Sequence, residues 1–181
     1  MKVLIDACVL YPTFLRELIT EWAAAGGFAP LWSDRILEEW RRAAARNGPA
    51  DQRIADAEIA ALSARFPAAI VAVDARTEAA LHLPDPDDNH VLAAAIDGGA
   101  DELLTLNVRD FPTNALAAHD LMRRHPDEFL LEAFHAEPDR IGAIVETALH
   151  RAASVGIDTS NRRALLKRAR VPRLAKALDQ F

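Results

Sequence analysis

The stretch LPDPDDNHVLAAAI, from Leu83 to Ile96, places three carboxylates between two prolines and the first turn of an apolar helix. The prolines keep the chain extended before the helix begins. At about 100° per residue, Asp88 lies on the same side of this helix as its apolar residues. An acid on a buried face is costly unless other groups pair with it. The stretch therefore predicts a polar site around Asp88, with Asp85 in a supporting position one turn earlier and Asp87 facing water.

Short aliphatic runs alternate with amphipathic patterns on either side of this stretch. The runs have the composition of strands buried on both faces, and the longer segments repeat apolar residues at the helical spacing. We predict strands at 2–6, 29–32, 69–73 and 102–106, with a weaker fifth strand at 117–122. Helices are predicted at 11–25, after Ser33, at 51–65, near 76–82 and after Asp88. This order predicts a three-layer α/β/α fold, in which helices cover both faces of a parallel sheet of four or five strands.

The helix after Ser33 decides between two neighbouring glutamates. Its inward residues are predicted to be Ile36, Leu37, Trp40 and Ala44. Glu38 lies nearly opposite their mean direction, whereas Glu39 lies on the flank, from which it can turn toward a strand end. We therefore choose Glu39 as the candidate site residue. In the helix at 51–65 the predicted apolar residues are Ile54, Ile59 and Leu62.

The C-terminal part of the chain is helical in pattern and opposite in charge. Helices are predicted at 125–134, 139–155 and 161–179, which suggests a first domain at 1–136 and a helical extension at 137–181. From residue 151 onward eight Lys or Arg stand against two Asp, a balance of +6, and the net charge of −6 leaves −12 on the first 150 residues. The basic residues could contact phosphates, but a solvated helix face or a dimer contact is an equal alternative. The candidates are Arg162, Arg163, Lys167, Arg168, Arg170 and Arg173.

Acids follow the predicted strands at the edge where α/β sheets form their sites. Ligands bind at the carboxyl ends of parallel strands. The residues predicted to meet there are Asp6, Glu39, Asp88, Asn107 and Asp110. Thr105, in the fourth strand, could donate a hydrogen bond to one of the carboxylates. Four converging carboxylates cannot all stay ionised without cations, and oxygen ligands suit Mg²⁺ or Mn²⁺. Such ions favour metal-assisted hydrolysis of a phosphodiester.

Four blocks of this sequence resemble those of PIN-domain nucleases, which include the VapC-type toxins of bacterial toxin–antitoxin systems. In family order they are VLIDACVL around Asp6, SDRILEEW around Glu39, DPDDNHVLAAAI around Asp88 and LLTLNVRDFP around Asn107 and Asp110. They span residues 2 to 112. Two features depart from the family: Asn107 stands where many relatives have Asp, and a long helical tail follows residue 136.

The resemblance implies Mg²⁺- or Mn²⁺-dependent ribonuclease activity, frequent homodimerisation and inhibition by a small antitoxin. It assigns the metal site to four acids, Asp6, Glu39, Asp88 and Asp110. Asn107 would then supply a neutral ligand or orient a water.

Three other readings compete with this one. A haloacid-dehalogenase-type phosphatase needs a second Asp two residues after Asp6, where this chain has Cys8. A response-regulator receiver needs an Asp after the third strand, a role for which Asp74 could be used, and a Lys after the fifth, which has no convincing candidate. A non-catalytic PIN-like scaffold would keep the fold with vestigial acids, and a metal titration separates it from an enzyme.

The amino-acid composition limits which class of protein this can be and in which cellular compartment we expect it. With 51% hydrophobic and 27% charged residues the chain reads as a soluble globular protein. No apolar run approaches the roughly 20 residues that a membrane span needs, and the N-terminus has no export pattern. The single cysteine, Cys8, fits a reducing compartment and reads as a small buried hydrophobe. We therefore expect a cytoplasmic protein without a membrane span.

Overall fold

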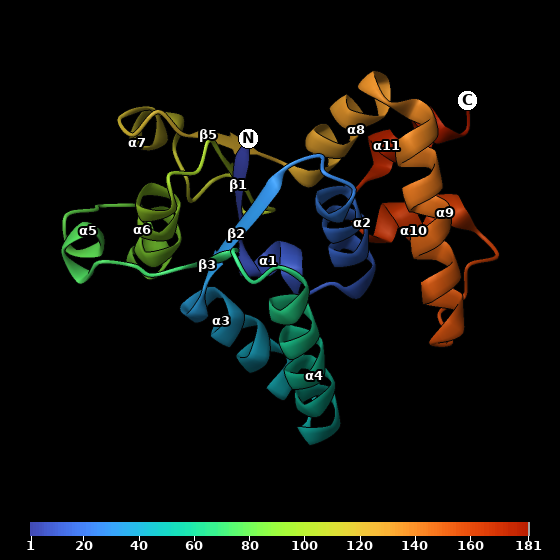
Figure 1. Ribbon diagram of the computed structural model, residues 1–181, viewed down its shortest axis with the longest axis horizontal. Coiled ribbons are helices and arrows are strands. Elements are labelled where there is room, and N and C mark those ends of the chain that lie inside the picture. The colour runs from blue at the N-terminus through green and yellow to red at the C-terminus, as the bar shows by residue number, and fades with distance from the viewer. Residues whose placement is uncertain (181) are drawn as a thin grey trace. The chain divides into compact units, whose positions relative to one another are not determined.

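A parallel sheet of five strands is the framework of the first part of the chain in the computed structural model, which describes residues 1–180 (Figure 1). The strands lie in the order β3-β2-β1-β4-β5, and every neighbouring pair is parallel. Their bounds are β1 Lys2–Ile5, β2 Ala29–Ser33, β3 Ile70–Val71, β4 Glu102–Leu104 and β5 Met122–Arg124. Because β1 pairs with both β2 and β4, the chain reverses its direction of travel across the sheet at β1. The predicted α/β fold with five parallel strands is confirmed.

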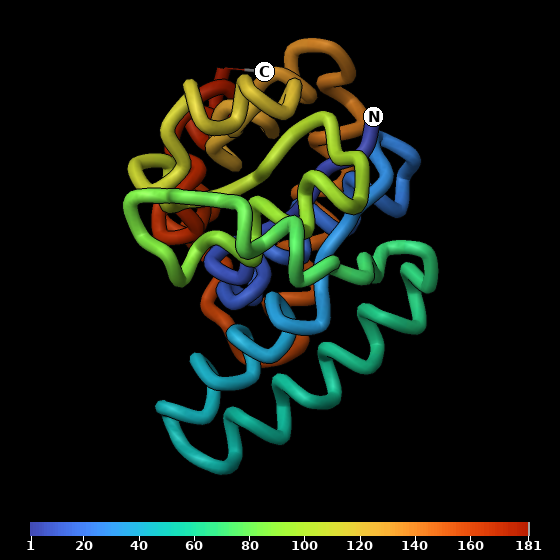
Figure 2. Tube along the Cα trace, turned by 90° about the vertical axis from the view of Figure 1, so that its left-hand side faces the viewer, coloured from blue at the N-terminus to red at the C-terminus, as the bar shows by residue number. Residues whose placement is uncertain are grey.

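Helices cover the two faces of this sheet. Those of the first unit are α1 Ala7–Leu10, α3 Asp34–Ala45, α4 Pro49–Arg65, α5 Ala75–Ala79, the 3-10 turn η1 Pro86–Asp88, α6 Asn89–Gly98 and α7 Thr113–Ala117. Helix α6 packs on four of the strands and carries α5 on its other side, whereas α3 packs on β2 and pairs with α4. Figure 1 shows α5 and α6 to the left of the strands and α3 and α4 below them, and Figure 2 shows α3 and α4 side by side.

The apolar residues of α3 and α4 determine which face of each helix is buried. All four predicted inward residues of α3 are buried, and Ser33 caps its N-terminus by accepting a hydrogen bond from the backbone N–H of Ile36. In α4 the prediction for Ile54 is wrong, since 58% of its surface is exposed. The buried stripe is Ala55, Ile59 and Leu62, at spacing four and three, and Ile54 lies one residue out of phase with it.

A second compact unit contains only helices and takes one of them from the N-terminal part of the chain. It comprises residues 12–27 and 125–181, of which the structure describes all but the last. The helices are α2 Thr13–Ala24, α8 Pro126–Ala136, α9 Pro138–Ser154, α10 Arg162–Arg168 and α11 Pro172–Leu178. Helix α9 packs on α2 and α8, and α11 packs on α8 and α10. Whether the chain divides into independent domains at residue 136 stays a prediction.

Buried polar groups hold this second unit together. Asp127 is 4% exposed and accepts hydrogen bonds from the backbone N–H groups of Arg173 and Leu174, so it caps α11 from α8. Arg151 on α9 pairs with Glu17 and Glu21 of α2. Side chains more than a hundred residues apart in the sequence therefore close the unit.

Three element predictions need correction. The helix predicted at 11–25 corresponds to α2 alone, whereas α1 was not predicted; the chain turns at Tyr11 and Pro12 between the two helices. The helix predicted at 161–179 divides into α10 and α11, because Arg170 adopts a positive φ of 66° and Pro172 begins a new helix. The fifth strand begins at Met122 rather than 117, because α7 takes the preceding residues and β4 pairs with Met122 to Arg124.

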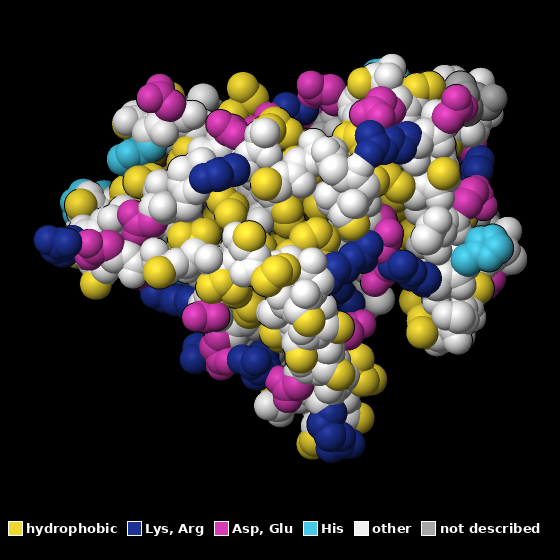
Figure 3. All heavy atoms as spheres, in the orientation of Figure 1, with side chains coloured by type: hydrophobic (Ala, Val, Ile, Leu, Met, Phe, Trp, Pro, Cys, Tyr) yellow, Lys and Arg dark blue, Asp and Glu magenta, His cyan; other side chains and the backbone are white. Residues whose placement is uncertain are grey.

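The surface of the first unit carries an apolar area at its β3 edge. Figure 3 shows hydrophobic side chains gathered over β2 and β3, where a pocket of about 590 Å³ is lined in part by Pro30, Leu31, Phe66 and Ile70. Within residues 1–180, no helix has the length and apolar character that crossing a membrane requires.

Candidate active site

Asp6 is fixed at the carboxyl end of β1 by bonds from two neighbouring elements. Its backbone N–H donates to the carbonyl of Leu104 at the end of β4, 3.1 Å away. Its side chain is 6% exposed, and Oδ2 accepts hydrogen bonds from Thr105 Oγ1 at 2.6 Å and from Cys8 Sγ at 3.0 Å. Both donors bind the same oxygen, so among the described residues Oδ1 is the atom left for a ligand. The predicted bond from Thr105 to a carboxylate is present.

Cys8 is a hydrogen-bond donor rather than a nucleophile. Burial, followed by the negative charge of Asp6, raises the pKa of its thiol well above the ordinary range. The protonated Sγ donates to Asp6 and also accepts a bond from the backbone N–H of Leu106 at 3.2 Å. The interpretation of Cys8 as merely a small buried hydrophobe therefore left out its bond to the candidate site.

Asp88 is the acid with the most unusual surroundings. It occupies the N-cap position of α6 but makes no capping hydrogen bond with its side chain, and its buried Oδ2 has no hydrogen-bond partner. Burial, followed by the negative charges of Asp6, Asp85, Asp110 and Glu39, raises its pKa to about 6. A carboxylate that does not cap its helix and that lies among four other acids has the surroundings of a cation ligand.

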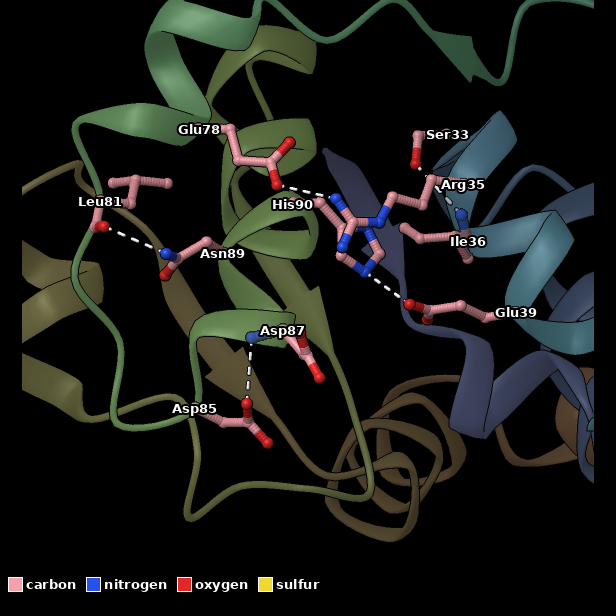
Figure 4. Close-up of polar contacts among 10 residues, drawn as sticks. All are labelled: Ser33, Arg35, Ile36, Glu39, Glu78, Leu81, Asp85, Asp87, Asn89 and His90. Carbon is pink, nitrogen blue, oxygen red and sulfur yellow. Dashed lines mark hydrogen bonds and ion pairs between the residues drawn. The ribbon is translucent and has the colours of Figure 1, made fainter.

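Glu39 extends from α3 toward α6, where a buried histidine receives it (Figure 4). The distance from His90 Nε2 to Glu39 Oε1 is 2.7 Å, and His90 is 2% exposed. Because a carboxylate only accepts, Nε2 is the donor. Glu38 instead pairs with Arg41 and Arg42 on the outer side of α3, which agrees with the choice of Glu39 made from helix phase.

The loop before α6 is tied down by Asn89. Its side chain accepts a hydrogen bond from the backbone N–H of Leu83 at 3.0 Å and donates to the carbonyl of Leu81 at 3.1 Å. Asp85 accepts a bond from the backbone N–H of Asp87, and the side chains of both aspartates are exposed (Figure 4). The loop therefore holds Asp85 close enough to act on Asp88 by its charge.

The turn after β4 carries the remaining candidates. The backbone N–H of Asn107 donates to Thr105 Oγ1 at 2.9 Å, and its carbonyl accepts from the backbone N–H of Asp110. Asn107 is exposed and Asp110 half-buried. Asp110 belongs to the acid group through its charge on Asp88, whereas the structure records no side-chain hydrogen bond for Asn107.

The carboxylates interact electrostatically without already forming a closed metal cage. Within residues 1–180, no three side chains among His, Cys, Asp and Glu lie in an arrangement that could hold a metal ion as it stands. The donor set nevertheless fits a hard divalent cation, since every candidate ligand atom is an oxygen and Oδ2 of Asp88 is buried without a hydrogen-bond partner. Small rotations of partly exposed side chains, Glu39 and Asp110 above all, would have to close the site.

The basic residues of the second unit differ in how far they are already neutralised. Arg162 pairs with Glu146 and Asp179, Arg163 with Asp179, and Arg173 with Glu128. Three others are exposed and form no ion pair with the described residues; they are Lys167, Arg168 and Arg170. Their contact with RNA stays a prediction.

From its place at the start of the helix after Asp88, His90 is expected to be a surface or supporting histidine rather than a metal ligand. The structure agrees with the supporting role, because His90 is buried and bonds to Glu39. Its partner lies on another helix, so the sequence alone did not identify it.

Comparison with known proteins places the sheet and its acids in a family. A model of the PIN domain matches residues 2–109, which include β1 through β4 and three of the four proposed metal-binding acids. The chain belongs to the PIN domain family. A curated relative, the putative ribonuclease VapC50 of Mycobacterium tuberculosis (strain ATCC 25618 / H37Rv), is 36% identical over 58 residues. This match covers 32% of the present chain and 34% of that relative. No solved structure gave a significant match.

Proposed function

We propose that this protein is a metal-dependent endoribonuclease that cleaves phosphodiester bonds of RNA with Mg²⁺ or Mn²⁺. The observation that supports this most strongly is Asp88, whose buried Oδ2 has no hydrogen-bond partner and whose pKa is raised by burial and by the acids gathered at the carboxyl edge of the sheet. Such a cluster is destabilised by its own charge, and a divalent cation relieves that repulsion. The PIN domain match and the name of the VapC50 relative are consistent with ribonuclease chemistry.

Each residue of the site has a separate task in this proposal. The metal ligands would be Asp6, Glu39, Asp88 and Asp110. Thr105 and Cys8 hold Asp6 Oδ2, which directs Oδ1 toward a ligand, and His90 holds Glu39. Asp85 and Asn107 support the site from the two loops that frame it. When bound, the cation would activate a water and stabilise the charge of the phosphorane-like transition state.

The biological setting follows from the same family. We propose that the protein is the toxin of a VapBC-type toxin–antitoxin system in the cytoplasm, with RNA as substrate and a small antitoxin as inhibitor. Homodimerisation belongs to this proposal as well. Co-purification with the product of an adjacent small open reading frame would test the antitoxin directly.

RNA cleavage with and without added metal tests the enzymatic proposal. We expect the wild type to cleave single-stranded RNA with Mg²⁺ or Mn²⁺ and to stop in EDTA, while Asp6→Asn and Asp88→Asn lose at least a hundredfold in rate. Asp51→Asn is the matched control, because Asp51 is exposed, lies on α4 and contributes no recorded charge to Asp88. Equal cleavage by the wild type and both site variants would refute the mechanism. An intact fold with neither metal binding nor cleavage would favour a non-catalytic scaffold.

A further inference from the structure

A pocket of about 480 Å³ lies directly beside the acid group, within the first unit. Glu39 and Asp87 line its wall together with Cys8, whose Sγ is 3.0 Å from Asp6 Oδ2. A cavity of this volume is large enough for one nucleotide, since small-molecule sites range from about 300 to 1,000 Å³. Anything bound there would therefore touch residues that contact the proposed reaction centre.

One face of α3 presents both an acidic side chain and basic side chains to this pocket. Arg35, Glu39, Arg42 and Arg46 follow one another at spacings of four, three and four, and all four line the pocket. Residues at these spacings share a face of an α-helix. The same helix face therefore presents a candidate metal ligand and, along its length, a row of guanidinium groups.

The arginines keep hydrogen-bonding capacity for a ligand. Arg46 is exposed and forms no ion pair with the described residues. Arg42 bonds Glu38 only through Nε, and Arg35 bonds Glu78 only through Nη1. Because a guanidinium carries five N–H donors, each of these two retains donors that could bind a phosphate.

The acids on the pocket wall do not cancel this capacity. Glu38 is held by Arg41 and Arg42, and Glu39 by His90, while Asp87 forms no ion pair with the described residues. Arg46 is consequently the cation of the wall that no carboxylate of the described residues satisfies.

An aromatic ring completes the pocket. Tyr11 is 38% exposed, and its hydroxyl is fixed by a hydrogen bond of 3.0 Å from Asn47 Nδ2. Ala7, Trp40 and Ala43 supply apolar wall. An exposed ring held by its edge is a surface on which a base can stack.

We propose that this pocket binds the nucleotide next to the scissile phosphate of a single-stranded RNA, with Arg46 and Arg42 on its phosphate and Tyr11 stacked on its base. The inference rests on the proposed ribonuclease function, and it adds where the strand lies: along α3, leading away from Glu39. Phosphate contacts position the strand and are indifferent to sequence, whereas the stacked base sets any preference at that step.

The test measures binding of a fluorescein-labelled 12-nucleotide single-stranded RNA by anisotropy, with the full chain in EDTA. We expect Arg46→Ala to weaken binding about tenfold and to reduce the log–log salt slope by about 0.7, the value for one phosphate of a single strand. Tyr11→Ala should also weaken binding about tenfold, within the range for loss of one stacked base. Tyr11→Phe should retain most of the affinity, because it keeps the ring and loses only the hydroxyl that accepts the bond from Asn47.

Arg53→Ala on α4 is the matched control, because Arg53 is equally exposed, forms no ion pair with the described residues and lies outside the pocket. Thermal unfolding of each variant reports whether it is folded. Wild-type affinity in Arg46→Ala and Tyr11→Ala would overturn the pocket, as would equal loss in Arg53→Ala or no RNA binding by the wild type. Equal loss in Tyr11→Phe and Tyr11→Ala would overturn the stacking role.

Cleavage kinetics with Mn²⁺ separate this inference from the function on which it rests. A rise in KM with unchanged kcat for Arg46→Ala supports the pocket. If the wild type cleaves RNA but Arg46→Ala and Tyr11→Ala bind RNA as the wild type does, the pocket proposal is wrong and the proposed function stands. The expected binding pattern without any cleavage by the wild type overturns the proposed function and leaves the RNA site standing.

Discussion

Two aspartates of the site have the same chemistry and opposite surroundings. Oδ2 of Asp6 accepts hydrogen bonds from Thr105 and Cys8, which fix the orientation of the side chain. Asp88 is half-buried, lacks a partner for Oδ2 and faces four acids, which favours its neutral form. The site is thus built from one carboxylate in a fixed orientation and one held at an energetic cost.

The cost at Asp88 predicts how stability without metal depends on pH. Its pKa is about 6 in the folded chain against an ordinary value of 3.8, so the folded state binds more protons between these values and stability falls as pH rises through this window. Asp88→Asn removes the charge. In EDTA at pH 8 we expect it to melt about 2–4 °C above the wild type, corresponding to about 1 kcal/mol for a partly screened group. At pH 4 the two should melt together.

Thermal unfolding across pH 4 to 8 checks this, with Asp51→Asn as the exposed control. If the melting temperature of the wild type rose relative to that of Asp88→Asn as pH increased, the account of Asp88 would be contradicted.

Between elements, the bond from His90 to Glu39 links α6 to α3 across the candidate site. It sets the direction of Glu39, whose side chain is 36% exposed and would otherwise sample several rotamers. We therefore propose that His90 positions Glu39 and is not itself a metal ligand.

His90→Phe should preserve the buried volume and lose the bond. We expect a 10- to 100-fold loss in Mn²⁺ affinity, the usual effect of removing a group that orients a ligand. His90→Asn or His90→Gln should recover part of it by donating to Glu39, and His82→Phe, at an exposed histidine of the preceding loop, should change nothing. Calorimetric titration measures all four. Equal affinity of His90→Phe and wild type, with both folded, would remove the positioning role.

Elements with a strong apolar period were predictable, and those set by one tertiary contact were not. The phase of α3 followed from Ile36 and Trp40 and separated Glu39 from Glu38. The break between α10 and α11 lies at Arg170, which has a positive φ, and Asp127 of α8 caps the start of α11; in the sequence only Pro172 indicated it. Strand β5 was misplaced because its register comes from pairing with β4. The bond between His90 and Glu39 joins residues 51 positions apart, which no local pattern encodes.

Across the whole molecule, charge is divided between an acidic first part and a basic end. The basic end is less free than its composition indicates, because Arg162, Arg163 and Arg173 are engaged by carboxylates of the second unit. Only the unpaired cations are expected to release counterions on binding RNA.

Two triple variants test this division of the basic residues. Replacing Lys167, Arg168 and Arg170 together by Gln should reduce the salt slope of RNA binding by up to about 2. Replacing Arg162, Arg163 and Arg173 by Gln removes the same formal charge and should alter the slope less. The slope is measured by anisotropy from 50 to 300 mM salt in the full chain. Equal effects of the two sets, or none from the first, would contradict a role of the unpaired residues in RNA binding.

The claim on which everything else depends is that the acids at the carboxyl edge of the sheet bind a divalent cation. Calorimetric titration of the metal-free chain with Mn²⁺ at pH 7.5 tests it most directly. We predict saturable binding to the wild type and to Asp51→Asn, and at least a tenfold weaker affinity in Asp6→Asn and Asp88→Asn. A wild type that gives no binding heat and no Mn²⁺-dependent rise in melting temperature, or an Asp88→Asn variant with unchanged affinity, would contradict it.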